Sequence, residues 1–239
     1  MIYIATHKGK HKAVSEDAVL VGASVFSDTS AIAPFCPSGF ICVADGVGGN
    51  SGGNLASTFI LKELSQIDVS KNIADDLNSI NERLLQYARN IAPNMASTLT
   101  GFSWAEDGIR LIHVGNSRAY IRQGKYLKQI TSDHTTYQWL MNLGRTDEAN
   151  ICNKSEILGC FGGGSAQYAS CLTVSLISDF ETALLTTDGV HDYLSVDALE
   201  GFLSDTSDGM EICTSILSSA IEAGSSDDIT VVLIRKGEK

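Results

Sequence analysis

The sequence predicts an α+β fold in which two antiparallel sheets pack together and carry helices on their outer faces. Short apolar or β-branched runs between turn residues indicate strands, and longer stretches with apolar residues at helical spacing indicate helices. These elements follow one another as sheet, helix pair, sheet, helix pair and strand. No internal repeat or low-complexity linker divides the order, so we expect a single domain over residues 1–239.

The first third of the chain is expected to begin as sheet and to end as a helix pair. Strands are predicted at 3–6, 18–26 and 40–44. Helical spacing of apolar residues begins at Asn54, and a second helix extends from Ile73 to Ile91. Pro93 closes this helix pair because proline cannot continue a helix.

The middle of the chain carries four closely spaced strand candidates, at 97–104, 109–114, 119–122 and 126–130. Turn signals at Asp107-Gly108 and Gln123-Gly124 lie between them, which predicts one antiparallel meander. A helix is expected at 135–144. The polar, glycine-rich stretch at 145–164 predicts an irregular surface segment.

The last third is expected to contain strands and a second helix pair. Strands are predicted at 171–177, 182–187 and 229–235, and helices at 196–203 and 210–223. We assign Asp208-Gly209 to a turn between the two helices.

Composition excludes several classes of protein. The formal charge is −11, and no Lys/Arg cluster is present that would neutralise a nucleic-acid backbone, so we expect no nucleic-acid partner. No apolar stretch approaches the roughly 20 residues of a membrane span, and Met1–Lys12 lacks a signal-peptide core. The six cysteines form no Cys-x-x-Cys pair and are interpreted as reduced thiols. We therefore expect a cytoplasmic monomer without membrane contact.

Four acidic spots share one pattern, in which an apolar strand lies beside a carboxylate that is usually accompanied by glycine or a second acid. They are Ser15-Glu16-Asp17, Val43-Ala44-Asp45-Gly46, Thr186-Thr187-Asp188-Gly189 and Ser226-Asp227-Asp228. A strand end holds its side chain rigidly, and a following glycine lets the backbone carbonyl turn toward a ligand. Mg²⁺ and Mn²⁺ prefer several such oxygens. Asp-Gly also marks ordinary β-turns, and that alternative stays open for each pair.

Five motifs in order resemble the metal-dependent, type 2C protein serine/threonine phosphatases, particularly the compact bacterial form. They are Lys12-Ala13-Val14-Ser15-Glu16-Asp17, Val43-Ala44-Asp45-Gly46-Val47-Gly48-Gly49, His113-Val114-Gly115-Asn116-Ser117-Arg118-Ala119-Tyr120, Leu185-Thr186-Thr187-Asp188-Gly189 and Ser226-Asp227-Asp228-Ile229-Thr230-Val231-Val232. The resemblance covers residues 3–234. It implies a four-layer α-β-β-α sandwich whose two antiparallel sheets are flanked by antiparallel helix pairs.

The resemblance also implies a metal site. Asp45 would bridge two Mn²⁺ or Mg²⁺ ions, with Glu16 and the Gly46 carbonyl on one ion and Asp188 and Asp227 on the other. A hydroxide held between the ions would attack phosphorus in line and release the serine or threonine hydroxyl. The substrate would be a phosphorylated protein, and the chain would oppose a serine/threonine kinase.

The resemblance further implies supporting residues around the two ions. Asp17 would belong to the metal site, and Asp17 and Asp192 would orient metal-bound waters. Asn116 and Asp192 would lie at a third, weaker divalent cation. Lys12 would bind the substrate phosphate and act, with Asp45 and Asp188, as a catalytic residue.

Three positions depart from the family pattern. Lys12 replaces the usual arginine, so a flexible point charge takes the place of a planar fork. Asn116 replaces an aspartate, which weakens a third metal. Asn50 stands where many relatives have histidine, and an amide cannot act as a general acid. A metal-bound water would then protonate the leaving group. His134 and His191 are the other candidate proton donors.

These observations leave three functions open. The first is an active phosphatase. The second is a catalytically attenuated relative that binds phosphoproteins as a regulatory module, and the third is an α+β domain whose carboxylates never converge.

The segment 145–164 corresponds to the flap of the family, for which substrate selection and a plain surface loop are the two interpretations. We interpret His11 and Arg118 as structural rather than phosphate-binding.

Overall fold

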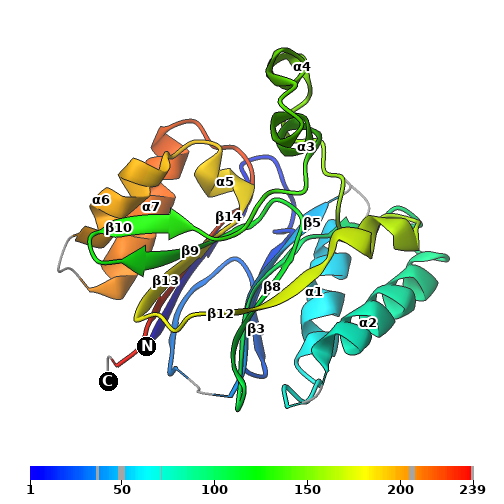
Figure 1. The fold of residues 1–239 in the computed structure, drawn as a ribbon, viewed down its shortest axis with the longest axis horizontal. Helices are drawn as coiled ribbons and strands as arrows, with labels where there is room; N and C mark the ends of the chain where they lie inside the picture. Colours follow the sequence, from blue (N-terminus) through cyan, green and yellow to red (C-terminus); the bar gives the residue numbers. More distant parts are fainter. Residues whose placement is uncertain (36–37, 48–51, 71, 205–207, 238–239) are drawn as a thin grey trace.

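Two antiparallel sheets packed face to face form the centre of the computed structural model, and helix pairs cover both outer faces (Figure 1). The structure describes residues 1–35, 38–47, 52–70, 72–204 and 208–237. The predicted four-layer α+β architecture is therefore confirmed. None of the helices in these ranges combines the length and apolar character that a bilayer span needs.

The first sheet has six strands in the order β10-β9-β13-β14-β1-β4. Their bounds are β10 Tyr126–Gln129, β9 Arg118–Gln123, β13 Thr182–Thr186, β14 Ile229–Arg235, β1 Ile2–His7 and β4 Ser30–Ala33. Successive side chains of a strand point to opposite faces. In β1, Ile2 and Ile4 accordingly pack between the sheets, whereas Tyr3 and Ala5 pack toward the helices.

The second sheet has eight strands, with the order β11-β6-β5-β7-β8-β12 and with β2 and β3 added beside β5. Their bounds are β11 Phe161–Gly162, β6 Ala96–Ser97, β5 Gly39–Val47, β7 Leu99–Ala105, β8 Gly108–Val114, β12 Thr173–Ile177, β2 Asp17–Val21 and β3 Ser24–Phe26. The long strand β5 is buried on both faces: Ile41 and Val43 face the other sheet, and Phe40 and Cys42 face the helices.

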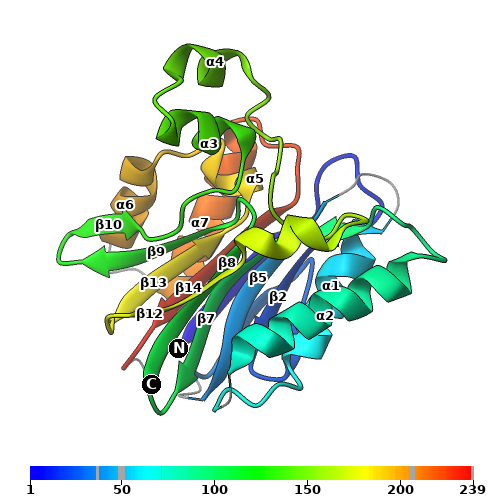
Figure 2. The same cartoon turned by 45° about the vertical axis from the view of Figure 1, so that its right-hand side comes forward.

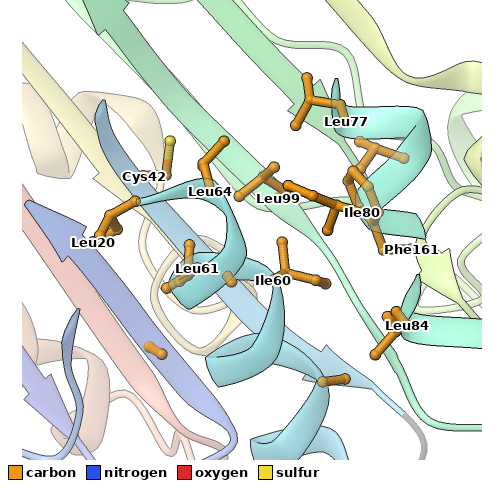
Figure 3. Close-up of a cluster of buried hydrophobic side chains, with 14 of the residues drawn as sticks. Leu20, Cys42, Ile60, Leu61, Leu64, Leu77, Ile80, Leu84, Leu99 and Phe161 are labelled. Atoms are coloured by element: carbon orange, nitrogen blue, oxygen red, sulfur yellow. The ribbon is translucent and has the colours of Figure 1, made fainter. Parts of the chain in front are cut away.

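Each outer face is covered by two helices. On the second sheet lie α1 (Gly53–Leu64) and α2 (Ile73–Ala88), and Figure 3 shows Ile60, Leu61 and Leu77 among the side chains that fill this layer. On the first sheet lie α6 (Val196–Ser204) and α7 (Gly209–Glu222). Apolar side chains thus form three buried layers, one between the sheets and one under each helix pair.

Three short helices and one 3₁₀ turn complete the described chain. They are α3 (Thr136–Asn142), α4 (Thr146–Ile151), α5 (Asp188–His191) and the 3₁₀ segment Ala166–Cys171. Figure 2 shows α3 and α4 projecting beyond the sandwich, at the end where α5 lies. This end of the molecule carries the acidic residues described below.

The structure corrects several local predictions. The strand predicted at 18–26 is a hairpin, because Gly22 turns the chain with φ of 60°. The single meander is wrong: β8 and β9 belong to different sheets. The segment 145–164 is not wholly irregular, since it includes α4 and β11. Asp208 does not form a turn but caps α7, accepting a hydrogen bond from the Met210 N–H at 2.8 Å.

Candidate functional site

The acidic strand ends from both sheets meet at one end of the sandwich. Asp45 lies in β5, and its Cα pairs with that of Asp17 at the start of β2. Asp188 follows β13 directly, and Asp227 lies two residues before β14. The second sheet therefore supplies one pair of acidic positions, and the first sheet supplies the other.

A cavity of about 270 Å³ opens between these positions. It is lined by Lys12, Glu16, Asp45, Gly46, Val47, Ser155, Ile157, Asp188 and Asp227. Six of the residues predicted for the site thus share one cavity, and Ser155 and Ile157 come from the segment after α4. A larger hollow of about 680 Å³ between α6 and α7 contains one carboxylate, Glu211, and offers no comparable set of oxygens.

The backbone of Asp45 is fixed on both sides. Its N–H donates to the Thr98 hydroxyl at 3.0 Å, and its carbonyl accepts from the Ser97 hydroxyl at 3.0 Å and from the Thr98 N–H at 2.9 Å. The next residue, Gly46, donates its N–H to the Glu16 carbonyl at 3.0 Å. Asp45, Gly46 and Glu16 are consequently held in one rigid frame.

Asp17 lies behind the cavity and does not line it. Its side chain is 1% exposed, and Oδ2 accepts hydrogen bonds at 2.7 Å from the hydroxyls of Thr187 and Thr230. Thr230 lies in β14 and Thr187 directly follows β13, both strands of the first sheet, so Asp17 links the two sheets. Its Oδ1 is buried without a hydrogen-bond partner among the described residues.

The Lys12 ammonium lies among three carboxylates. Its Nζ is 3.0 Å from Glu16 Oε2, 2.7 Å from Asp227 Oδ1 and 2.9 Å from Asp228 Oδ2. Asp228 is 2% exposed and also accepts the backbone N–H groups of Gly9 and Glu16, each at 2.7 Å. Asp228 thereby positions both the lysine and the acidic residue four positions after it.

Gly53, the first residue of α1, leaves room for two predicted ligands. A Cβ at this position would lie 2.4 Å from Glu16 Oε1 and 2.8 Å from the Gly46 carbonyl oxygen. Both oxygens therefore lie beside the same point, and only glycine lets the helix approach them. One ion shared by Glu16 and the Gly46 carbonyl, as the sequence predicts, would require such proximity.

Asn116 and Asp192 lie near Asp188 but do not line the cavity. The Asn116 amide donates to Asp188 Oδ2 at 3.0 Å, and its own Oδ1 is buried without a partner in the described part of the chain. Asp192 ends the short helix α5, where its side chain is exposed. The negative charge of Asp192 contributes to a raised pKa of Asp188.

Burial and mutual repulsion disfavour the ionised carboxylates. Burial, with the charges of Asp188 and Asp17, holds the pKa of Asp45 well above its usual range. Burial and Asp227 raise the pKa of Asp188 to about 6, and burial raises the pKa of Asp17 to about 8. For Lys12, partial burial would lower the pKa, but hydrogen bonds to the surrounding carboxylates outweigh it and raise the pKa. The cluster as a whole favours a bound cation.

The donor set suits a hard divalent cation. Carboxylate and backbone carbonyl oxygens are the ligands of Mg²⁺ and Mn²⁺, and the Lys12 ammonium marks a position where a cation is stable. Within the described ranges, no group of three or more His, Cys, Asp or Glu side chains is drawn together as a ready-made site for one ion. Mg²⁺ keeps several waters and uses one or two carboxylates, so a hydrated ion does not need such a group.

The remaining candidates lie outside the cavity lining. His191 is buried against the Thr186 hydroxyl at 2.8 Å, and burial holds its pKa well below the usual range. His134 accepts the Gly115 N–H at 3.1 Å through Nδ1. Arg118 forms a bidentate pair with Asp133, with Nε donating to Oδ1 at 3.0 Å and Nη2 donating to Oδ2 at 2.7 Å, which supports the structural role predicted for it. Asn50 lies outside the described residues.

Three residues of the site were missed from the sequence. Gly53 follows another glycine, which signals a close approach but not its target. Asp228 could not be told from Asp227, because adjacent acids look equivalent until the backbone direction is known. Thr98 carries no sequence signal for its contact with Asp45.

Similar proteins are found among curated sequences and solved structures. The "Serine/threonine phosphatase stp" of Listeria welshimeri is 24% identical over 212 residues, covering 82% of this chain and 84% of that protein. The "Serine/threonine protein phosphatase PstP" of Mycobacterium tuberculosis is 26% identical over 238 residues, covering 95% of this chain and 43% of that protein. Serine/threonine phosphatase Stp1 from Staphylococcus aureus superimposes with a TM-score of 0.80 at 22% identity, over 99% of this chain and 95% of that one. No family model matches the chain.

Proposed function

We propose, from the premise that this chain belongs to the bacterial PPM-type (type 2C) serine/threonine phosphatase family, that it hydrolyses phosphoserine and phosphothreonine monoesters on proteins. The observation that carries the proposal is the convergence of Glu16, Asp45, Asp188 and Asp227 on one cavity. A protein phosphorylated by a serine/threonine kinase is the substrate class.

Some of the cavity residues would bind metal ions, and Lys12 would bind the substrate phosphate. Two Mn²⁺ or Mg²⁺ ions, when bound, supply a water that ionises near neutral pH and neutralise the charge of the phosphate oxygens. Asp45 lines the cavity together with Asp188 and Asp227, and, as the family resemblance implies, it would contact both ions. Glu16 and the Gly46 carbonyl would hold one ion, and Asp188 and Asp227 would hold the other.

The other predicted residues support these groups. Lys12 offers its ammonium to the phosphate from the same cavity. Asp17 adds negative charge behind Asp45, and Asp192 adds it beside Asp188. No cysteine lines the cavity among the described residues, which agrees with water as the nucleophile.

A second candidate function is a regulatory module that binds phosphoproteins with little catalysis. The contact between the Asn116 amide and Asp188 favours it, because an amide offers a third cation one neutral oxygen in place of a carboxylate. A weakly held third cation would slow turnover while leaving phosphate recognition intact.

The proposal is tested by hydrolysis of p-nitrophenyl phosphate and of a phosphothreonine peptide with added Mn²⁺. We expect turnover that EDTA abolishes and that Asp45→Ala reduces at least ~100-fold, since an ion lost from the site removes several kcal/mol of transition-state stabilisation. Asp107→Ala is the matched control, because Asp107 also precedes glycine but forms a turn and pairs with Arg110. Folded protein that binds Mn²⁺ and hydrolyses neither substrate would contradict the proposal.

A further inference from the structure

The Lys12 ammonium contacts three carboxylates of the acidic cluster at once. Its Nζ lies within 3.0 Å of carboxylate oxygens of Glu16, Asp227 and Asp228. Two of these partners, Glu16 and Asp227, are the carboxylates that we assign to different ions. The ammonium therefore bridges the two halves of the metal site.

The backbone holds Lys12 at this place. The Lys12 N–H donates to the Gly9 carbonyl at 3.1 Å, and the Lys10 N–H donates to the Ser226 carbonyl at 3.1 Å. A Cβ at Gly9 would lie 2.8 Å from the Ser226 carbonyl oxygen, so the two segments pack backbone to backbone. The loop that carries Lys12 is thus docked on the segment that carries Asp227 and Asp228.

The side chain itself can still move. It is 28% exposed, and its four methylene groups let the ammonium swing while the backbone stays in place. Asp228 is buried and bound to two backbone N–H groups, so it remains a fixed anchor for the ammonium. Lys12 consequently has a second position available near the cavity.

From this geometry we propose that Lys12 is an internal counter-ion of the site, which competes with divalent cations for Glu16 and Asp227. A divalent ion on either carboxylate lies close to the ammonium, and like charges at such short distance repel each other. Metal binding therefore displaces Lys12 from Glu16 and Asp227, and Asp228 retains it at the cavity. The inference rests on the proposed function, because it takes these carboxylates as metal ligands.

The experiment is a calorimetric titration of Mn²⁺ into metal-free protein. We expect Lys12→Gln to bind Mn²⁺ about tenfold more tightly than the wild type, because the competing charge is gone. Lys12→Arg keeps the charge and should stay within about threefold of the wild type. Lys10→Gln is the matched control: it removes the same charge from an exposed side chain two residues away and should leave the affinity unchanged.

A second readout is the unfolding temperature. Without metal, Lys12→Gln should unfold at a lower temperature than Lys10→Gln, because its carboxylates have lost their counter-ion, and Mn²⁺ should close this gap. A Lys12→Gln protein that folds only with Mn²⁺ would also support the proposal. One that folds in neither condition, or that binds Mn²⁺ no more tightly than the wild type, would overturn it.

The two proposals fail in distinguishable ways. Wild-type protein that binds Mn²⁺ without hydrolysing phosphoesters contradicts the proposed function alone. If the protein is active but Lys12→Gln does not change its Mn²⁺ affinity, only the counter-ion proposal is contradicted. Wild-type protein that binds no Mn²⁺ contradicts both.

Discussion

At the scale of single residues, a few atoms decide how closely the acidic groups of the cavity approach one another. Gly53 has no side chain where a methyl group would touch the Glu16 carboxylate. Asn116 presents an NH₂ group to Asp188, where a carboxylate would repel it. Gly53 leaves space and Asn116 lowers the repulsion, and neither residue lines the cavity itself.

Gly53→Ala should impair the site. The new methyl group would meet Glu16 Oε1 at 2.4 Å and the Gly46 carbonyl oxygen at 2.8 Å, so the carboxylate or the helix must shift. We expect Mn²⁺ affinity and kcat/KM each to fall at least ~10-fold, because a displacement of about 1 Å is costly in a pre-organised site. Gly201→Ala is the control, since a Cβ there meets no atom within 4 Å and alanine favours a helix by roughly 0.5–1 kcal/mol. Equal metal affinity in both variants would contradict the role of Gly53.

Asn116→Asp should have opposite effects without and with metal. Without metal, the new carboxylate faces Asp188 in place of a hydrogen-bond donor 3.0 Å away, and we expect a loss of about 1–3 kcal/mol in the free energy of unfolding. With excess Mn²⁺, a gain in kcat of at least ~5-fold is expected if a third cation limits turnover. Asn90→Asp, which adds the same charge at an exposed site far along the chain, should show neither effect. No gain in rate together with tight phosphopeptide binding would favour the regulatory module.

At the scale of elements, the connections between strands deliver the site residues. Between β8 and β9 the chain passes from one sheet to the other, and Gly115 adopts φ of 111° with Thr98 too close for any side chain there. This crossing places Asn116 beside Asp188. The segment after α4 similarly supplies Ser155 and Ile157 to the cavity, so the projecting helices α3 and α4 are continuous with the site.

Exposed apolar side chains on α3 and α4 should affect protein substrates more than small ones. Trp139 and Ile151 are 51% and 87% exposed, and a peptide bound at the cavity would extend toward this segment. We expect serine at both positions to raise KM for a phosphothreonine peptide about 5- to 10-fold, as contacts of about 1 kcal/mol or slightly more are lost. The kcat/KM for p-nitrophenyl phosphate should change less than about twofold. Leu176→Ser, on β12 and 62% exposed, is the control; equal losses on both substrates would show a general structural effect.

At the scale of the whole molecule, three apolar layers hold two sheets whose acidic ends repel each other. Asp17 joins the sheets through Thr187 and Thr230. A second buried polar group, His113, lies in the second sheet, where it is 2% exposed and its Nε2 donates to the Ser132 carbonyl at 2.9 Å. The stability of the sandwich therefore depends on the protonation of groups buried in the second sheet.

His113 should make the fold less stable in acid. Burial, aided by His134, lowers the pKa of His113 to about 4, compared with 6.5 for an ordinary histidine. Between these values the unfolded chain binds the proton and the folded chain does not, so the contribution is complete above about pH 6.5 and is lost as the pH falls toward 4. It amounts to at most about 3 kcal/mol.

The measurement is urea unfolding of metal-free protein between pH 4.5 and 7.5. The carboxylates with raised pKa values make the fold more stable in acid, which is the opposite effect. The difference in free energy of unfolding between wild type and His113→Gln therefore isolates the contribution of the histidine. We expect this difference to shrink as the pH falls. His7→Gln, at an exposed position, is the control. A difference that is independent of pH would contradict the role of burial.

The order of strands and helices could be predicted from the sequence, because apolar periodicity reports which face of each element is buried. Periodicity does not report which strand pairs with which, and the meander across 97–130 was therefore wrong: β9 pairs with β13, more than 60 residues away along the chain. The short elements β4 and α5 were missed because a few residues hold too little pattern to detect. The helix predicted to Ile91 ends at Ala88, whose carbonyl accepts the N–H groups of Ile91 and Ala92 in a turn that precedes Pro93.

The sequence by itself determined the chemistry of the site: carboxylates at strand ends, glycines beside them, and five motifs in the order of one family. Tertiary structure alone decided how these groups meet. Only the folded chain shows that Lys12 bridges Glu16 and Asp227, that Asp228 anchors it, and that Gly53 gives two oxygens room to approach one point. The physical reason is that residue type sets what an atom can bind, whereas contacts between residues more than 200 positions apart, such as Lys12 and Asp228, arise only from the packing of the two sheets.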